Sequence, residues 1–285
     1  MSRDIYSEVT DKLVAAIETD PGDPIMPWHR GGANAVPHNA LTDHEYQGVN
    51  ILNLWVVGQA SGFTSNVWGT YKQWQALGAQ VRKGEKSTPV VFYKQVVKRS
   101  EESEKGEDEI IRILKYSTTF NADQVDDWQP PAPTSAITPP ERLEAVDTVV
   151  TDTGAHIIER GASAYYRPAT DTVHMPDPAR FFDTQSGTRT ENFYAVLLHE
   201  LTHWTGHPTR CDRDLLNRFG SEAYAMEELI AELGAAFLCA RLGISPTPRD
   251  DHAQYLANWL KVLKLDNKAI FTAAAKAQAA VDHIL

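Results

Sequence analysis

The sequence predicts an α+β protein built from two domains. Its 285 residues exceed the usual size of one hydrophobic core. Five prolines fall in WQPPAPTSAITPPE, residues 128–141, which lacks a periodic apolar pattern and is typical of an exposed, semi-rigid linker. Helical and strand patterns occur on both sides of it. We therefore expect one domain over residues 1–128, a linker over 129–141 and a second domain over 142–285.

Helices and one long hairpin are predicted in the first domain. Apolar residues recur at helical spacing over residues 4–19, and residues 48–60 and 70–77 are further helix candidates. Two runs rich in β-branched and aromatic residues, TPVVFYKQVVK and EIIRILKYSTTF, flank a polar tract at residues 100–109. This order predicts a hairpin with a long polar loop.

Strands followed by two long helices are predicted in the second domain. Residues 163–176 read as two short strands around a Pro-Ala-Thr-Asp turn. Thr188 and Glu191 have the spacing of a capping box, and they open a helix that ends near Gly206 and Pro208. Residues 221–242 form a second long helix with an apolar stripe.

The composition favours a folded protein without a membrane span. Hydrophobic residues make up 42% of the chain and charged residues 23%, which argues against overall disorder. No apolar run reaches the roughly 18 residues of a transmembrane helix, and the N-terminus reads as an amphipathic helix rather than a leader. Cys211 and Cys239 are too few for a disulfide framework. We expect a cytoplasmic protein with two ordinary thiols.

Charge is distributed unevenly along the chain. The net charge of −11 divides into 13 − 15 = −2 for residues 1–120 and 14 − 23 = −9 for residues 121–285. Within residues 66–99, however, seven Lys and Arg oppose only Glu85, which leaves a local charge of +6. Because fields act over a Debye length of ~8 Å, such a patch can attract phosphate even on an acidic protein.

The stretch HELTH, residues 199–203, predicts a metal site. Residues four apart share one helix face, so His199 and His203 can bind one ion at ~2.0 to 2.1 Å. Glu200 then lies beside the ion, where it can take a proton from the bound water. This pattern matches the HExxH motif of zincin metallopeptidases, so we expect Zn²⁺, with another divalent ion such as Mn²⁺ as an alternative. The competing interpretation is two histidines on a buried helix.

A zincin needs a third protein ligand. A metzincin would place a histidine where this chain has Thr209. The segment EELIAE, residues 227–232, resembles instead the second helix of glutamate-type zincins. That resemblance implies Glu228 as the ligand and Glu232 as the acid that holds His199. The chain departs from the family's Asn, Ser and Asp at Glu227, Ala231 and Glu232, and Glu232 itself remains an alternative ligand.

Three further features carry both a functional and a structural interpretation. Tyr224, one turn before Glu228, is a candidate to stabilise a developing oxyanion, or it is a core tyrosine. His207 is a candidate contact to the metal or the substrate. The strand Thr172–Met175 is a candidate edge strand that holds an extended peptide by main-chain pairing, or one that only closes a sheet.

The basic stretch predicts a surface for single-stranded nucleic acid. Single strands are held by cations along the backbone and by aromatic rings that stack on bases. Candidate contacts are Trp68, Tyr71, Lys72, Trp74, Arg82, Lys83, Lys86, Tyr93 and Lys94, with Phe92 interleaved. The alternative is an aromatic core with ordinary surface lysines. No helix-turn-helix, zinc-finger or RNP signature occurs, which disfavours sequence-specific reading of duplex DNA.

Taken together, the two halves resemble ArdC-type antirestriction proteins of conjugative plasmids. The motifs are PWH at residues 27–29, EYQGVNILNL, TYKQWQALGAQVRKGEKSTPVVFYK, HELTHWTGH and YAMEELIAELGAAFL. The resemblance implies an N-terminal single-stranded-DNA-binding domain shared with TraC-type primases and a C-terminal zincin-like domain. It also implies a role in protecting incoming plasmid DNA during conjugation. The protein substrate of the metal domain stays unidentified.

Three functional hypotheses follow. In the first, the protein binds single-stranded DNA and is also an active zinc peptidase that cleaves a host defence protein or a DNA-bound protein. In the second, it binds DNA and its metal site is structural or vestigial. A metal-dependent nuclease is the weakest, because histidines suit zinc hydrolysis better than the carboxylate-rich magnesium sites of nucleases.

Overall fold

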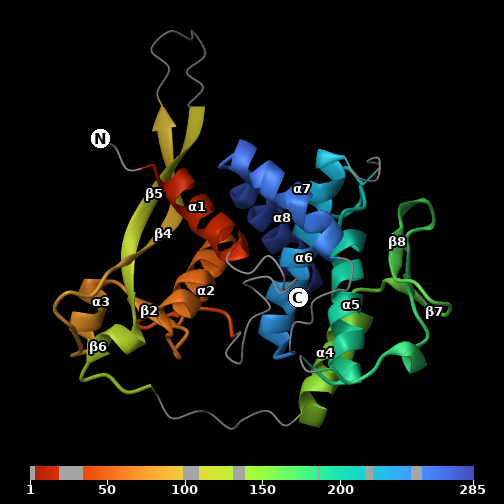
Figure 1. The fold of residues 1–285 in the computed structure, drawn as a ribbon, viewed down its shortest axis with the longest axis horizontal. Coiled ribbons are helices and arrows are strands. Elements are labelled where there is room, and N and C mark those ends of the chain that lie inside the picture. The colour runs from red at the N-terminus through yellow and green to blue at the C-terminus, as the bar shows by residue number, and fades with distance from the viewer. Residues whose placement is uncertain are drawn as a thin grey trace.

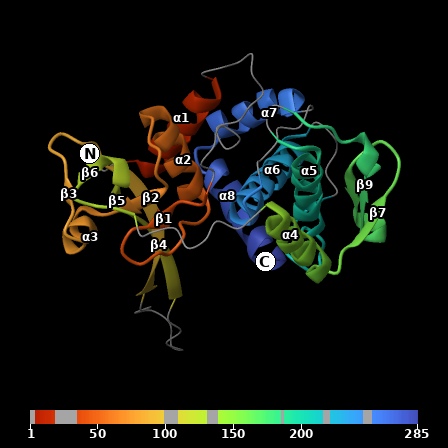
Figure 2. The ribbon, with the colours of Figure 1, turned by 90° about the horizontal axis from the view of Figure 1, so that it is seen from below.

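The computed structural model contains three β-sheets and places a layer of helices between the four-stranded and the three-stranded sheet (Figures 1 and 2). It describes residues 4–18, 35–98, 109–130, 139–184, 187–215, 221–244 and 252–285. The predicted α+β class is confirmed. Among the described residues, none of the helices is long and apolar enough to span a bilayer.

The larger sheet lies in the N-terminal half and has the order β1-β2-β5-β4. Its strands are β1 (His38–Asn39), β2 (Val67–Gly69), β4 (Thr88–Lys98) and β5 (Glu109–Asn121). β4 and β5 pair antiparallel over their full length, from Thr88 opposite Thr119 to Lys98 opposite Glu109, which confirms the predicted hairpin. A second pair, β3 (Gln80–Val81) and β6 (Val125–Asp126), lies next to the short helix α3 (Tyr71–Ala76).

Strand β4 is the last strand of the larger sheet, and helix α2 (Val49–Ser61) covers part of its outer edge. The side chain of Asn50 accepts from the backbone N–H of Val91 and donates to the Val91 carbonyl, both at 2.8 Å. The buried Asn53 donates to the carbonyl of Pro89 at 2.8 Å. Unpaired edge groups are open to pairing with another chain. These two asparagines satisfy part of that edge from a helix.

The smaller sheet lies in the C-terminal half and has the order β7-β9-β8. It contains β7 (His156–Glu159), β8 (Tyr165–Arg167) and β9 (Thr172–Met175). β9 is paired on both sides, parallel to β7 and antiparallel to β8. The prediction that Thr172–Met175 is an edge strand is therefore wrong, because neither of its sides is open to a peptide. The predicted strand-turn-strand unit itself is present, with β8 at the edge.

The C-terminal helices are α4 (Pro139–Asp152), α5 (Arg189–Trp204), α6 (Glu222–Leu242), α7 (His252–Leu265) and α8 (Ala269–Ile284). The predicted capping box at Thr188 and Glu191 opens α5, and Ser221 caps α6. α5 and α6 approach closely at Gly234, where an added Cβ would lie 2.5 Å from the Cγ2 of Thr202. This contact sets the distance between the two helices that carry the candidate metal ligands.

One hydrophobic core joins the two halves. Helices α1 (Ile5–Glu18) and α2 contact α7 and α8, and Trp55 of α2 lies 6.0 Å from the ring of Phe237 in α6. The Gly48 N–H donates to Gln278 Oε1 at 3.2 Å. The boundary placed at residues 129–141 stays a prediction, and residues 131–138 lie outside the described chain. On either side of it, the described residues share buried contacts.

Candidate metal centre and candidate nucleic-acid surface

Helix α5 places His199 and His203 side by side, one turn apart. Their ring centroids are 4.9 Å apart, and His199 is only 3% exposed. Glu200, which follows His199, is 2% exposed and lies on the wall of the same cavity as His203. The arrangement agrees with the helical spacing of the HELTH motif.

Glu228 of α6 faces both imidazoles. Its carboxylate oxygens lie 3.7 Å from His199 Nε2 and 3.6 Å from His203 Nε2. Two donors bound to one zinc ion at ~2.0 to 2.1 Å in tetrahedral geometry would lie about 3.4 Å apart. Among the described residues, these three form the one group of His, Cys, Asp and Glu side chains whose donor atoms all lie within 4.8 Å of one another. The donor set therefore fits a divalent cation.

The pKa of Glu228 also favours a metal ligand. Burial raises the pKa of Glu228, but the polar contact with His199 and the charges of the two histidines outweigh burial and lower it to about 2. Because a carboxylate must be deprotonated to bind a metal, this side chain is in its ligand form at neutral pH.

Each candidate ligand histidine is held from behind by a second carboxylate. Glu232 lies 3.6 Å from His199 Nδ1, and Glu227 lies 3.1 Å from His203 Nδ1. Such contacts fix the ring orientation and make the opposite nitrogen a better ligand. Glu232 thus lies on the far side of His199 from Glu228, in the position expected for an orienting acid.

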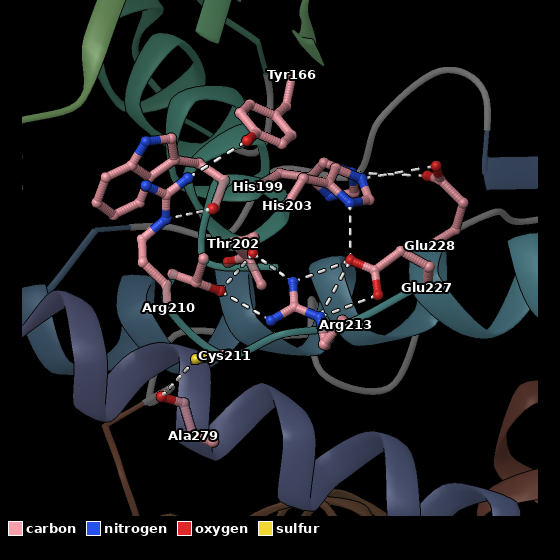
Figure 3. A network of polar contacts seen from close by, with 12 residues as sticks. Tyr166, His199, Thr202, His203, Arg210, Cys211, Arg213, Glu227, Glu228 and Ala279 are labelled. Carbon is pink, nitrogen blue, oxygen red and sulfur yellow. Dashed lines mark hydrogen bonds and ion pairs between the residues drawn. The ribbon is translucent and has the colours of Figure 1, made fainter. Parts of the chain in front are cut away.

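Arg213 completes the support of His203 (Figure 3). It is 7% exposed and holds both oxygens of Glu227, at 2.9 and 3.0 Å. Its guanidinium also donates to the Thr202 carbonyl at 2.6 Å and to Thr205 Oγ1 at 2.9 Å. Neither Glu227 nor Arg213 was predicted from the sequence as a site residue. No local motif joins an arginine in the loop after α5 to a glutamate of α6.

A cavity of about 190 Å³ opens beside the cluster. Glu200, His203 and Glu228 line it on one side, and Tyr165 and Tyr166 of β8 on the other. Tyr224 also lines the cavity, and its side chain hydrogen-bonds Glu228. His207 is hydrogen-bonded to Thr209 at 2.8 Å and is absent from the described donor group.

Strand β8 is fastened to α5 through the turn that precedes β9. Asp171, at the end of this turn, accepts from Tyr166 at 2.8 Å and from Arg210 Nη1 at 3.0 Å. Arg210 also lies 3.8 Å over the Trp204 ring and donates to its carbonyl at 2.7 Å. Burial first, and then the hydrogen bond to Asp171, raises the pKa of Tyr166. The edge strand is therefore held at a fixed position beside the cavity.

Two of the predicted nucleic-acid contacts need correction. Trp68 is 1% exposed and Trp74 is fully buried. Trp68 packs with Leu54 and Val90, while the Trp74 indole donates to the Phe120 carbonyl at 3.0 Å. Their ring faces are covered by the protein, so neither can stack on a base in this structure. The sequence allowed two interpretations, stacking on bases or an aromatic core, and these two tryptophans belong to the core.

Arg82, predicted as a phosphate contact, is bonded to other residues of the protein. Its guanidinium contacts Glu85 at 3.1 Å, Asp126 at 3.5 Å and the carbonyl of Val125 at 3.3 Å. It thereby joins the loop after β3 to β6. Much of its charge is neutralised locally, which weakens its assignment as a phosphate contact.

Other predicted contacts are exposed. Tyr71 is 41% exposed and Tyr93 is 55% exposed. The exposed lysines are Lys72, Lys83, Lys86 and Lys94.

The hairpin β4–β5 adds an outward face. Phe92 lies opposite Lys115, and Lys94 lies opposite Ile113. Residues directly opposite in an antiparallel pair point to the same side of the sheet. Phe92 is 50% exposed and Ile113 is 39% exposed. Lys115 and Ile113 were not predicted as part of this hairpin face, because composition does not show which residues of β4 and β5 lie opposite each other.

Comparisons with known proteins agree with this geometry. A family model described as the N-terminal domain of anti-restriction factor ArdC matches residues 3–120, and one described as a zincin-like metallopeptidase matches residues 144–276. Crystal structures of the antirestriction protein ArdC from plasmid R388, metal-free and Mn(II)-bound, are similar with TM-scores of 0.80 and 0.78. Both are 38% identical and cover 99% of this chain and 97% of theirs.

Relatives were also found at the sequence level. The uncharacterized protein y4eC of Sinorhizobium fredii is 46% identical over 285 residues, which covers 98% of this chain and 91% of that protein. Two DNA primases TraC of Escherichia coli are 35% and 36% identical. They match 100% and 98% of this chain, which spans only 27% and 20% of their length. The similarity to the primases thus includes both halves.

Proposed function

The chain belongs to the family of ArdC antirestriction proteins, and on this premise we propose that it binds single-stranded DNA and protects incoming plasmid DNA from restriction during conjugation. The observation that carries the proposal is the hairpin face. On it two neighbouring cross-strand pairs, Phe92 with Lys115 and Ile113 with Lys94, each combine an apolar side chain with a lysine. Exposed rings and apolar side chains contact bases, while the lysines contact phosphates. Tyr71, Lys72, Lys83 and Lys86 extend the same chemistry along the N-terminal half.

A titration with labelled single and double strands at two salt concentrations tests this function. The wild type is compared with Phe92→Ala/Lys94→Ala/Lys115→Ala and with Lys72→Ala/Lys83→Ala/Lys86→Ala. We expect a salt-sensitive preference for single strands that both variants weaken, the first more strongly because it also removes stacking worth ~1 to 3 kcal/mol per base. Equal affinity of wild type and variants would refute the proposed surface.

A second candidate activity, zinc-dependent peptide hydrolysis, is supported by the position of Glu200. This buried carboxylate lies on the cavity wall with His203 and Glu228, beside the edge strand β8. Zinc, held by His199, His203 and Glu228, would supply Lewis acidity. Glu200 would accept the proton of the attacking water, Tyr224 would donate to the developing oxyanion, and β8 would pair with the peptide main chain.

The decisive comparison is between the wild type and Glu200→Gln, both loaded with zinc. Cleavage of a protein by the wild type and not by the variant supports the peptidase. If Glu200→Gln protects DNA from restriction as well as the wild type does, protection depends on DNA binding alone. Scission of single strands by the metal-loaded protein would instead support a nuclease.

A further inference from the structure

Among the described strands, β8 forms an edge of the smaller sheet, and its side chains alternate between the inner and outer faces of that sheet. Tyr166 faces inward, where it lines the cavity and contacts Asp171 and Arg210. Side chains alternate along a strand, so Tyr165 and Arg167 belong to the outer side of the sheet. Tyr165 also borders the cavity, but its ring stacks on His174, its cross-strand partner. A peptide that extends the sheet at β8 would alternate in the same way. Every second side chain of that peptide would lie beside Tyr165 and Arg167.

The outer side of this sheet carries positive charge. His174 of β9 stacks on the Tyr165 ring, with centroids 4.5 Å apart and planes at 14°. Arg167 lies 5.5 Å from the same ring and donates to the Tyr165 hydroxyl at 3.3 Å. Burial, followed by the charges of Arg167, Arg160 and His156, lowers the pKa of His174. These residues therefore face a common field of positive charge.

This charge is not neutralised by carboxylates within the described part of the chain. Neither Arg160 nor Arg167 has an ion pair there, although the chain from residue 121 onward has a net charge of −9. Glu159, next to Arg160 in sequence, acts electrostatically on Tyr194 of α5, which indicates that it lies on the inner side. An exposed cationic and aromatic surface on an acidic domain is complementary to carboxylates.

We propose that Arg167, with Tyr165, His174 and Arg160, forms a specificity site for acidic side chains of a peptide bound along β8. The proposal rests on the peptide-binding role of the metal domain, although not on hydrolysis itself. A substrate with Asp or Glu at alternate positions would present carboxylates to Arg167 while its other side chains face the cavity. Arg160 follows β7, on the other side of β9, and adds only to the positive field of this surface. Single-stranded nucleic acid is the competing occupant, and the test includes it.

The test measures peptide binding to the zinc-loaded Glu200→Gln protein, which separates binding from cleavage. The probes are labelled decapeptides in which Thr alternates with Asp, Gln or Lys, because Thr favours extended chains. One exposed ion pair contributes ~0.2 to 1 kcal/mol, so the Asp peptide should bind about 1.4- to 5-fold more tightly than the Gln peptide, and the Lys peptide should bind least tightly. Arg167→Glu, added to Glu200→Gln, should reverse the order of the Asp and Lys peptides, and Arg160→Glu, which changes only the more distant field, should reduce the preference without reversing it. Lys276→Glu, an exposed residue of α8, has the same charge change and should keep the order.

The proposal fails if the three peptides bind alike or not at all, or if Arg167→Glu keeps the order. It also fails if the peptides show no preference while Arg167→Glu weakens binding of a ten-nucleotide oligothymidylate. That result would assign the surface to single-stranded nucleic acid. Its failure is distinguishable from that of the peptidase. If the Asp peptide binds to Glu200→Gln but the wild type cleaves no peptide, the acidic specificity stands and hydrolysis does not. If the wild type cleaves the Asp and Lys peptides equally, hydrolysis stands and the specificity site does not.

Discussion

Arg213 and Glu227 form a buried, two-point ion pair, with contacts of 2.9 and 3.0 Å, behind the candidate ligand His203. Burial raises the pKa of Glu227, but its hydrogen bonds with His203 and Arg213 have the larger effect, so the net shift of this pKa is downward. The glutamate therefore stays ionised and keeps its hold on His203 Nδ1. Figure 3 shows Arg213 reaching from the loop after α5 towards this carboxylate.

Arg213→Met should weaken both folding and metal binding. Removing one partner of a buried pair leaves an uncompensated charge, which costs about 3 to 5 kcal/mol of unfolding free energy. Loss of the orienting contact should lower zinc affinity by roughly 10- to 100-fold. Urea denaturation and calorimetric zinc titration measure the two effects. The double variant Arg213→Met/Glu227→Gln should recover part of the stability, and an equally unstable double variant would contradict the explanation.

The two acids on either side of His199 should differ in their effect on metal binding. Glu228→Gln removes a ligand atom and should abolish measurable zinc binding, whereas Glu232→Gln should cost about 10- to 100-fold in affinity. Zinc titration of both metal-free variants measures the difference. A larger loss in Glu232→Gln would assign the third ligand to Glu232.

Gly234→Ala should separate helices α5 and α6. The new methyl group would lie 2.5 Å from Thr202 Cγ2 and 2.7 Å from its Oγ1, closer than atoms in contact can lie. Overpacking of this kind costs about 1 to 3 kcal/mol. Thermal unfolding should show the loss, and Gly234→Ala/Thr202→Ala should recover much of it. If the double variant is no more stable than Gly234→Ala alone, the clash with Thr202 is not the cause.

The Asp171 ion pair should contribute to stability at neutral pH but not in strong acid. The hydrogen bond from Arg210 is the main cause that lowers the pKa of Asp171. A lowered folded-state pKa gives stability that is fully present above the unfolded value of 3.8 and is lost as the pH falls through the lower folded-state pKa. Asp171→Asn should therefore lower Tm at pH 7, and its difference from the wild type should shrink steadily as the pH is lowered below 3.8. The exposed Asp152→Asn serves as control, and a Tm difference that stays constant below pH 3.8 would contradict this linkage.

Local patterns predicted the elements that depend on neighbouring residues. Apolar periodicity placed α1, α2 and α6 within about two residues, and the box at Thr188 placed the start of α5. The HELTH spacing correctly brought His199 and His203 to one face, because residues four apart on a helix always share one.

Contacts between distant elements were harder to predict. Strand order made β9 central and β8 the edge, and no residue pattern in this short segment fixes that choice. Aromatic residues interleaved with cations suggested base stacking, but Trp68 and Trp74 are buried in two separate hydrophobic clusters. Composition alone does not distinguish a buried ring from an exposed one.

Because the two halves share one hydrophobic core, they should stay associated after the chain is cut between them. Because α2 packs on α8, and Trp55 contacts Phe237, the halves are held together by burial as well as by the backbone. A proteolytic cut within residues 131–138 should leave two fragments in a noncovalent complex that migrates with the intact protein and separates only in denaturant. The halves, expressed from separate genes, should behave as complementing fragments rather than as independent modules.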